Sequence, residues 1–78
     1  MTKDERYLVK LFELALKRGD LFEEINMYEV GRAMGQNDRS VENIVRMLAQ
    51  SNFLKKGQGN NVYLTKQGEA YVESLSAK

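Results

Sequence analysis

The sequence contains no cysteine, no histidine and no proline. Without cysteine the chain can form no disulfide and supplies no thiolate nucleophile. Histidine is the usual general base of enzymes and, with cysteine, the usual ligand of zinc, so the absence of both excludes imidazole catalysis and ordinary zinc sites. Without proline, no backbone φ angle is fixed by a ring.

The chain also lacks a long hydrophobic run and an excess of charge of one sign. No stretch approaches the ~20 apolar residues of a membrane-spanning helix. The opening MTKDERYLVK carries two acids and no apolar core, unlike a secretory signal, so we expect a cytoplasmic protein. Twelve basic against eleven acidic residues give a formal net charge of +1. Contact with nucleic acid would therefore require basic residues gathered on one surface.

The length of the chain, 78 residues, suits one domain, and we assign residues 1–78 to it. Such a chain buries only about 60% of the surface that it exposes when unfolded, so its core is small. Nothing in the sequence places two titratable side chains together in a cleft. We therefore expect no enzymatic activity and no cofactor.

Residues 4–18, DERYLVKLFELALKR, have the three- and four-residue apolar spacing of an amphipathic helix. Acids near its start and bases near its end suit the helix dipole, and Gly19 suits the left-handed position that ends a helix. Its apolar residues are Tyr7, Leu8, Leu11, Phe12, Leu14, Ala15 and Leu16. They either pack into the core or, being more than one small domain covers, form a homodimer contact through the first and last helices.

Residues 26–54 predict two helices joined by a short turn containing glycine, the spacing of a helix-turn-helix. Asn26 is a good cap for the first of these helices, and Glu29 completes a pattern close to a capping box. Gly31 costs this helix about 1 kcal/mol of propensity relative to alanine, which close approach of another helix would explain. Gly35 ends the helix.

The next helix is predicted over residues 38–51 and has two distinct faces. Either Asn37 or Asp38 can cap it, and Asn37 is favoured. One face is apolar and contains Val41, Ile44, Val45 and Leu48. The opposite face contains Arg39, Asn43, Arg46 and Gln50, with Ser40 and Glu42 on its flanks. Arg, Asn and Gln are side chains that bind base edges in the major groove, so this face is a candidate DNA contact. An ordinary solvated face is the alternative, and Glu42 counts against DNA unless Arg46 neutralises it.

Residues 53–64, FLKKGQGNNVYL, predict a β-hairpin with a flexible tip. Ile25 is expected to form a short strand that pairs with it. The side chains of the hairpin that can bind phosphate are Lys55, Lys56, Gln58, Asn60 and Asn61. An ordinary turn with exposed lysines is the alternative.

Thr65 is suited to cap a last helix, TKQGEAYVESL. Its inward-facing residues are expected to be Tyr71, Val72 and Leu75, with Leu64 just before the helix. The predicted order is helix, short strand, helix, turn, helix, two-stranded hairpin and helix. This predicts a mostly helical α+β fold with the order of a winged helix.

Several segments resemble the core of bacterial and archaeal winged helix-turn-helix transcription regulators. The likeness lies in VGRAMG at residues 30–35, Ser40-Val41, IVRML at residues 44–48 and NFL at residues 52–54. YLTKQG at residues 63–68 is similar to the phrase that often closes the wing and opens the final helix in MarR-like and PadR-like groups.

The resemblance implies sequence-specific binding of double-stranded DNA by a small transcription regulator. It implies that the helix at about residues 38–51 lies in the major groove and the wing, residues 55–61, on the DNA backbone. Lys66, at the start of the last helix, adds a further positive charge. The candidate DNA-binding residues are therefore Arg39, Ser40, Asn43, Arg46, Gln50, Lys55, Lys56, Gln58, Asn60 and Lys66. Because fold alone does not decide function, a winged-helix protein–protein interaction module without DNA binding is the alternative.

Overall fold

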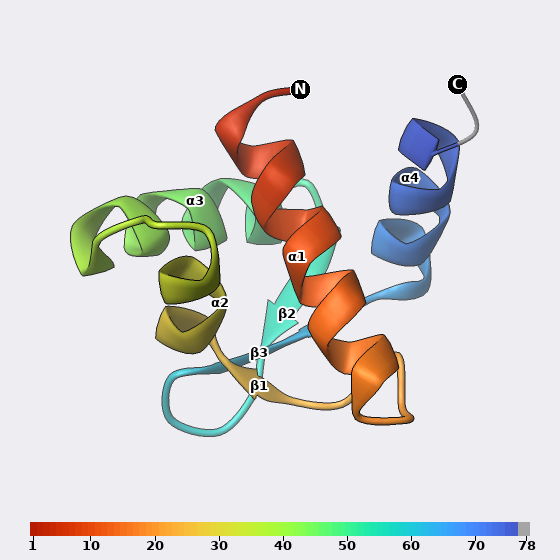
Figure 1. Ribbon diagram of the computed structural model, residues 1–78, viewed down its shortest axis with the longest axis horizontal. Helices are drawn as coiled ribbons and strands as arrows, with labels where there is room; N and C mark the ends of the chain where they lie inside the picture. The colour runs from red at the N-terminus through yellow and green to blue at the C-terminus, as the bar shows by residue number, and fades with distance from the viewer. Residues whose placement is uncertain (77–78) are drawn as a thin grey trace.

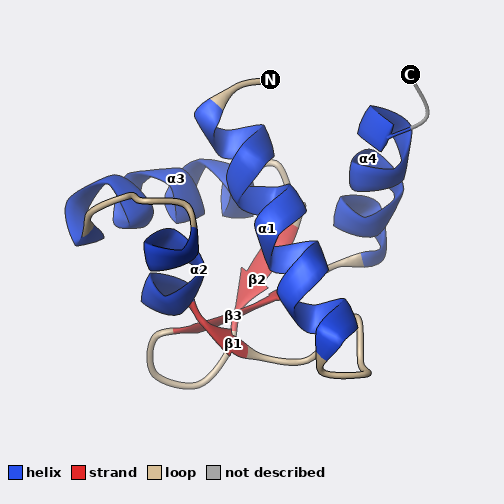
Figure 2. Ribbon diagram, viewed as in Figure 1, coloured by secondary structure: helices blue, strands red, loops and turns tan. Residues whose placement is uncertain are grey.

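The computed structural model describes residues 1–76, which form four helices and a three-stranded antiparallel sheet (Figure 1). The helices are α1 (Lys3–Lys17), α2 (Met27–Ala33), α3 (Asp38–Gln50) and α4 (Lys66–Ser76). The strands are β1 (Ile25–Asn26), β2 (Leu54–Lys56) and β3 (Asn61–Leu64), in the order β1–β3–β2. The predicted mostly helical α+β class is confirmed, and the order of elements along the chain is the predicted one (Figure 2).

Helix α1 begins one residue earlier than predicted because Thr2 caps it. The Glu5 amide donates to Thr2 Oγ1 at 3.1 Å and the Thr2 amide donates to Glu5 Oε1 at 2.8 Å, which is a complete capping box. Gly19 follows the helix with φ +86°, as predicted for the left-handed position. One of the apolar residues expected to pack into the core does not do so, because Leu16 is 60% exposed.

Helices α2 and α3 pack closely where glycine allows it. A methyl group built at Gly31 would overlap Val41 Cγ2 of α3, which confirms the predicted close approach of another helix. Asn26 caps α2 as predicted, its Oδ1 accepting the Tyr28 amide hydrogen at 2.9 Å. The suggested capping-box partner is wrong, because the Glu29 carboxylate instead binds the guanidinium of Arg18.

The sheet joins the hairpin to the segment that enters α2. Ile25 lies opposite Val62, which confirms the predicted short strand, and Lys55 lies opposite Tyr63. Strand β2 begins at Leu54, one residue later than predicted. In Figure 1 the loop between β2 and β3 lies on the same side of the molecule as α2, whereas α4 lies on the opposite side.

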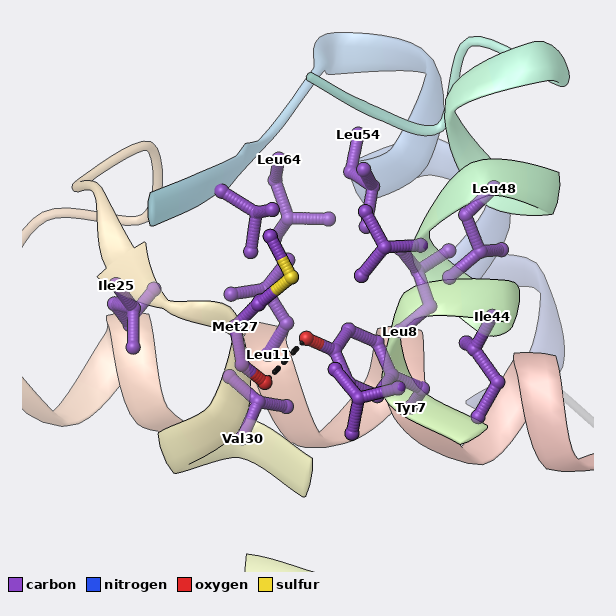
Figure 3. Close-up of a cluster of buried hydrophobic side chains, with 14 of the residues drawn as sticks. Tyr7, Leu8, Leu11, Ile25, Met27, Val30, Ile44, Leu48, Leu54 and Leu64 are labelled. Atoms are coloured by element: carbon purple, nitrogen blue, oxygen red, sulfur yellow. Dashed lines mark hydrogen bonds between the residues drawn. The ribbon is translucent and has the colours of Figure 1, made fainter. Parts of the chain in front are cut away.

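The core is apolar and receives side chains from every helix and strand, with Val72 as the member from α4. Figure 3 shows a cluster of these buried side chains around Tyr7 and Met27. Its largest fully buried member is Tyr7, whose hydroxyl donates a hydrogen bond to the Met27 carbonyl at 2.8 Å. Burial raises the pKa of Tyr7, so the hydroxyl keeps its proton across the ordinary pH range. The Met27 amide donates to the Asn60 carbonyl at 2.9 Å, so Met27 is held on both sides.

Helix α4 is capped by Thr65, as predicted: Thr65 Oγ1 accepts the Gly68 amide hydrogen at 2.9 Å. Gly68 is buried, and a methyl group there would overlap the Phe53 carbonyl oxygen. The rings of Phe53 and Tyr71 stack with centroids 4.5 Å apart. Of the residues predicted to face inward, Leu64 and Val72 are buried, whereas Tyr71 and Leu75 are only half-buried.

We predict that Tyr7→Phe lowers the free energy of unfolding by about 1–2 kcal/mol, because the buried Met27 carbonyl loses its side-chain donor while the ring volume is kept. Urea unfolding followed by circular dichroism measures the change. Tyr63→Phe, at a half-buried tyrosine of the sheet, is the matched control and should change stability by less than about 0.5 kcal/mol. Equal losses in the two variants would contradict the role given to the Tyr7 hydroxyl.

Candidate nucleic-acid interface

The orientation of α3 is set by its apolar face. Val41, Ile44, Val45 and Leu48 are buried, which turns the opposite face outward. That face presents four exposed side chains: Arg39, Asn43, Arg46 and Gln50. Asn37 fixes the start of the helix by accepting the Ser40 amide hydrogen at 2.9 Å, and Ser40 itself is half-buried. The predicted division of α3 into two faces is therefore confirmed.

The two arginines of this face are free of acidic partners among residues 1–76. The salt bridges in that part of the chain join Lys10 to Glu13 and Arg18 to Glu23 and Glu29. One arginine, Arg46, donates from Nη2 to Asn43 Oδ1 at 2.9 Å, which is a neutral partner one turn away. Among the described residues, Arg39 and Arg46 are therefore not neutralised by an ion pair, although α3 also carries Asp38 and Glu42.

The acid on this face, Glu42, is held by a tyrosine and not by arginine. The Tyr28 hydroxyl donates to Glu42 Oε2 at 2.7 Å, from α2 to α3. The hydrogen bond to Glu42 raises the pKa of Tyr28, because ionised phenol beside a carboxylate is unfavourable. The neutralisation of Glu42 by Arg46 that DNA binding was expected to need is therefore not seen.

The hairpin carries its basic residues at the base and an acid against its tip. Lys55, Lys56, Gln58 and Asn60 are exposed, as the sequence predicted for contacts with phosphate. Glu24, just before β1, places Oε1 3.1 Å from the Gln58 amide and 3.3 Å from Asn61 Nδ2. Asn61 donates one of its two Nδ2 hydrogens to Glu24, and its predicted contact with phosphate stays a prediction.

An open groove of about 510 Å³ runs between α3, the start of α2 and the hairpin. Four of the predicted DNA-binding residues line it, two from α3 and two from the hairpin: Arg46, Gln50, Lys56 and Asn60. Tyr28 and Glu42 line it too, over an apolar floor of Met27, Val45 and Ala49. The fold therefore brings together polar side chains that are as far apart in the chain as Tyr28 and Asn60.

The other predicted site residues lie outside this groove. Arg39, Ser40 and Asn43 continue along α3 beyond it, Lys55 points to the other face of the sheet from Lys56, and Gln58 lies in the tip. Lys66 begins α4, and no contact in the structure associates it with the groove. Sequence reasoning missed Glu24 and the Tyr28–Glu42 pair. The one sequence feature that could have pointed to Tyr28 was its position on the side of the second helix away from the apolar residues.

A second, smaller hollow lies between the start of α1, the end of α3 and α4. Its lining includes two acids of α1, Asp4 and Glu5, and the exposed Met47. The Tyr71 hydroxyl donates to Glu5 Oε2 at 2.6 Å, and this bond is the main reason that the pKa of Glu5 is lowered. This hollow is acidic and apolar, so it is not suited to phosphate.

The described residues, 1–76, contain neither a cluster of metal ligands nor a membrane-spanning helix. In that part of the chain, no group of three or more acidic side chains is placed to hold a metal ion. None of its helices is both long enough and apolar enough to cross a bilayer.

Comparison of the chain with protein-family models, with curated proteins and with solved structures gave no match.

We predict that Glu24→Ala loosens the hairpin tip, because the Gln58 amide loses its acceptor. Amide exchange at Gln58 should quicken at least tenfold, which corresponds to about 1.4 kcal/mol of local protection. Glu24→Gln keeps an acceptor oxygen and should retain most of the protection. Unchanged exchange at Gln58 in Glu24→Ala would show that the carboxylate does not fix the tip.

Proposed function

We propose that this chain is a winged-helix domain that binds double-stranded DNA, with α3 in the major groove and the hairpin as the wing on the backbone. The observation that carries the proposal is the groove in which Arg46 and Gln50 of α3 face Lys56 and Asn60 of the hairpin. Each wall of the groove, α3 on one side and the hairpin on the other, thus offers one cation and one side-chain amide. Side chains of these types bind phosphates and base edges.

The size of α3 supports insertion into the major groove. A helix of 13 residues is about 20 Å long, and the major groove, about 12 Å wide, admits one helix. The side chains at positions 39, 43, 46 and 50 follow one side of this helix at three- and four-residue steps. They can reach successive base pairs while the apolar face stays in the core.

Exposed basic side chains near α3 and the hairpin would supply affinity for DNA, although the net charge of the protein is only +1. Arg39, Arg46, Lys55 and Lys56 are exposed, and among residues 1–76 none of them is in a salt bridge. If all four bind phosphate, the logarithm of the binding constant should fall with the logarithm of salt with a slope of about −3 to −4. We propose that the protein acts in the cytoplasm as a small sequence-specific regulator.

A protein-interaction role is the second candidate, and the hollow beside Met47 favours it. The Met47 side chain is 53% exposed next to the stacked Phe53 and Tyr71 rings, with Asp4 and Glu5 at the rim. An apolar hollow with an acidic rim suits a partner with apolar and basic side chains, or a second copy of the chain. Sedimentation of the free chain tests the homodimer.

Fluorescence anisotropy of a labelled duplex, measured at two or more salt concentrations, tests DNA binding. We predict that Arg46→Ala weakens binding by about 1–3 kcal/mol and relaxes sequence preference if Arg46 reads a base. Equal weakening on all sequences with a shallower salt slope would make Arg46 a phosphate contact. Lys17→Ala removes the same charge from the last turn of α1 and should leave binding nearly unchanged.

The proposal fails if the wild-type chain shows no binding that weakens with salt. It also fails if Arg46→Ala and Lys17→Ala have the same effect, because binding would then follow total charge and not the α3 surface.

A further inference from the structure

Glu42 is the acidic side chain among the residues that line the groove, and the other polar side chains there all carry hydrogen-bond donors. Glu42 is exposed on α3 between Arg39 and Arg46 and lines the groove. An unrestrained glutamate in this place would rotate away from DNA phosphates. Here Glu42 Oε2 accepts the Tyr28 hydroxyl hydrogen at 2.7 Å, so α2 holds the side chain at the groove.

We propose that Glu42 is a specificity residue, which selects cytosine at one position of the bound duplex by accepting a hydrogen bond from the cytosine N4 amino group. The inference rests on the proposed DNA binding. Because a carboxylate has two oxygens with about four acceptor positions, the bond from Tyr28 leaves Oε1 for the base.

The chemistry of the major groove favours cytosine over the other bases. Only cytosine N4 and adenine N6 donate hydrogens there, whereas guanine and thymine present acceptors that repel a carboxylate. The adenine amino group lies beside N7, which is also an acceptor, so the second carboxylate oxygen is repelled. On cytosine the amino group is flanked by the C5–H instead, and the nearest acceptor is O6 of the paired guanine. Glutamate therefore discriminates for cytosine, as a negatively charged acceptor should.

Tyr28 acts as a positioning residue for this contact. Its own place is fixed because Asn26 Oδ1 accepts its amide hydrogen and because α2 packs on α3 at Gly31. The carboxylate is thus oriented before DNA arrives, which reduces the entropy lost on binding. A base contact made by a fixed group is also more selective, since the group cannot turn to avoid a wrong base.

A purely structural role for the Tyr28–Glu42 bond makes a different prediction, and one substitution separates the two. Glutamine in place of Glu42 keeps an acceptor oxygen for Tyr28 but removes the charge and adds an NH₂ donor. Glutamine pairs in a bidentate manner with adenine N6 and N7. If the bond only joins α2 to α3, Glu42→Gln should leave the selected sequence unchanged.

The experiment is enrichment of bound duplexes from a random pool by the wild-type chain and by Glu42→Gln, Tyr28→Phe and Glu73→Gln. The wild-type chain should enrich one position as cytosine, and replacing that pair should weaken binding about tenfold. Glu42→Gln should change this position to adenine and leave the others unchanged. Tyr28→Phe should keep cytosine with smaller discrimination. Glu73→Gln, on the exposed side of α4, is the charge-matched control and should enrich the wild-type motif.

The failures are distinguishable. If the wild-type chain enriches a motif and Glu42→Gln enriches the same one, the inference is overturned and the DNA-binding proposal stands. If Glu42→Gln binds every duplex more strongly but selects the same motif, the inference is likewise overturned, because Glu42 would then only repel DNA. A wild-type chain that binds DNA without base preference also overturns it. Absence of salt-dependent DNA binding overturns both. Thermal melting of each variant, followed by circular dichroism, verifies that it is folded.

Discussion

The relative positions of α1, α2 and the hairpin depend on one residue, Met27. Its carbonyl accepts the Tyr7 hydroxyl hydrogen inside the core, and its amide donates to the Asn60 carbonyl at the hairpin tip. Its side chain is buried and forms part of the groove floor. A short stretch of backbone therefore joins the first helix, the start of the second and the wing-like hairpin. These bonds place the hairpin wall of the groove relative to α2, and the packing of α2 on α3 at Gly31 positions the α3 wall.

Sequence reasoning succeeded where the signal is local. The period of apolar residues in α3 predicted its buried and exposed faces, and the caps at Asn26, Asn37 and Thr65 follow from side-chain chemistry within three residues. Gly31 also predicted a contact between helices, because a glycine inside a helix is explained by close approach of another helix, here α3 at Val41. Since these signals recur in order along the chain, the mostly helical α+β fold could be predicted.

Contacts between distant segments could not be predicted in the same way. Glu24 and the hairpin tip are 34 and 37 residues apart in the chain, and Tyr28 is 14 residues from Glu42. No periodicity links such pairs, so the sequence predicts neither the contacts of Glu24 with the hairpin nor the bond between Tyr28 and Glu42. In the folded chain Glu42 accepts the Tyr28 hydroxyl hydrogen and Glu29 binds Arg18, and both partners lie on another helix or beyond its end.

The groove combines two positively charged hydrogen-bond donors, Arg46 and Lys56, with one fixed acceptor, the Glu42 carboxylate. This combination suits selective binding more than strong binding. Affinity for DNA grows with the number of phosphates neutralised, and the exposed cations here are few. Discrimination among bases depends on complementary donors and acceptors. Under the proposed DNA binding, Arg46, Gln50 and Glu42 on one helix would supply sequence preference, and the hairpin lysines would supply general attraction.

The most direct test of the interface is a titration of the ¹⁵N-labelled chain with a short duplex, followed by amide chemical shifts. We expect the largest shifts in residues 38–50 and 55–60, with the amides of α1 and α4 little changed. Shifts concentrated around Met47, Phe53 and Tyr71, or no shifts at low salt, would contradict a DNA-binding surface made by α3 and the hairpin.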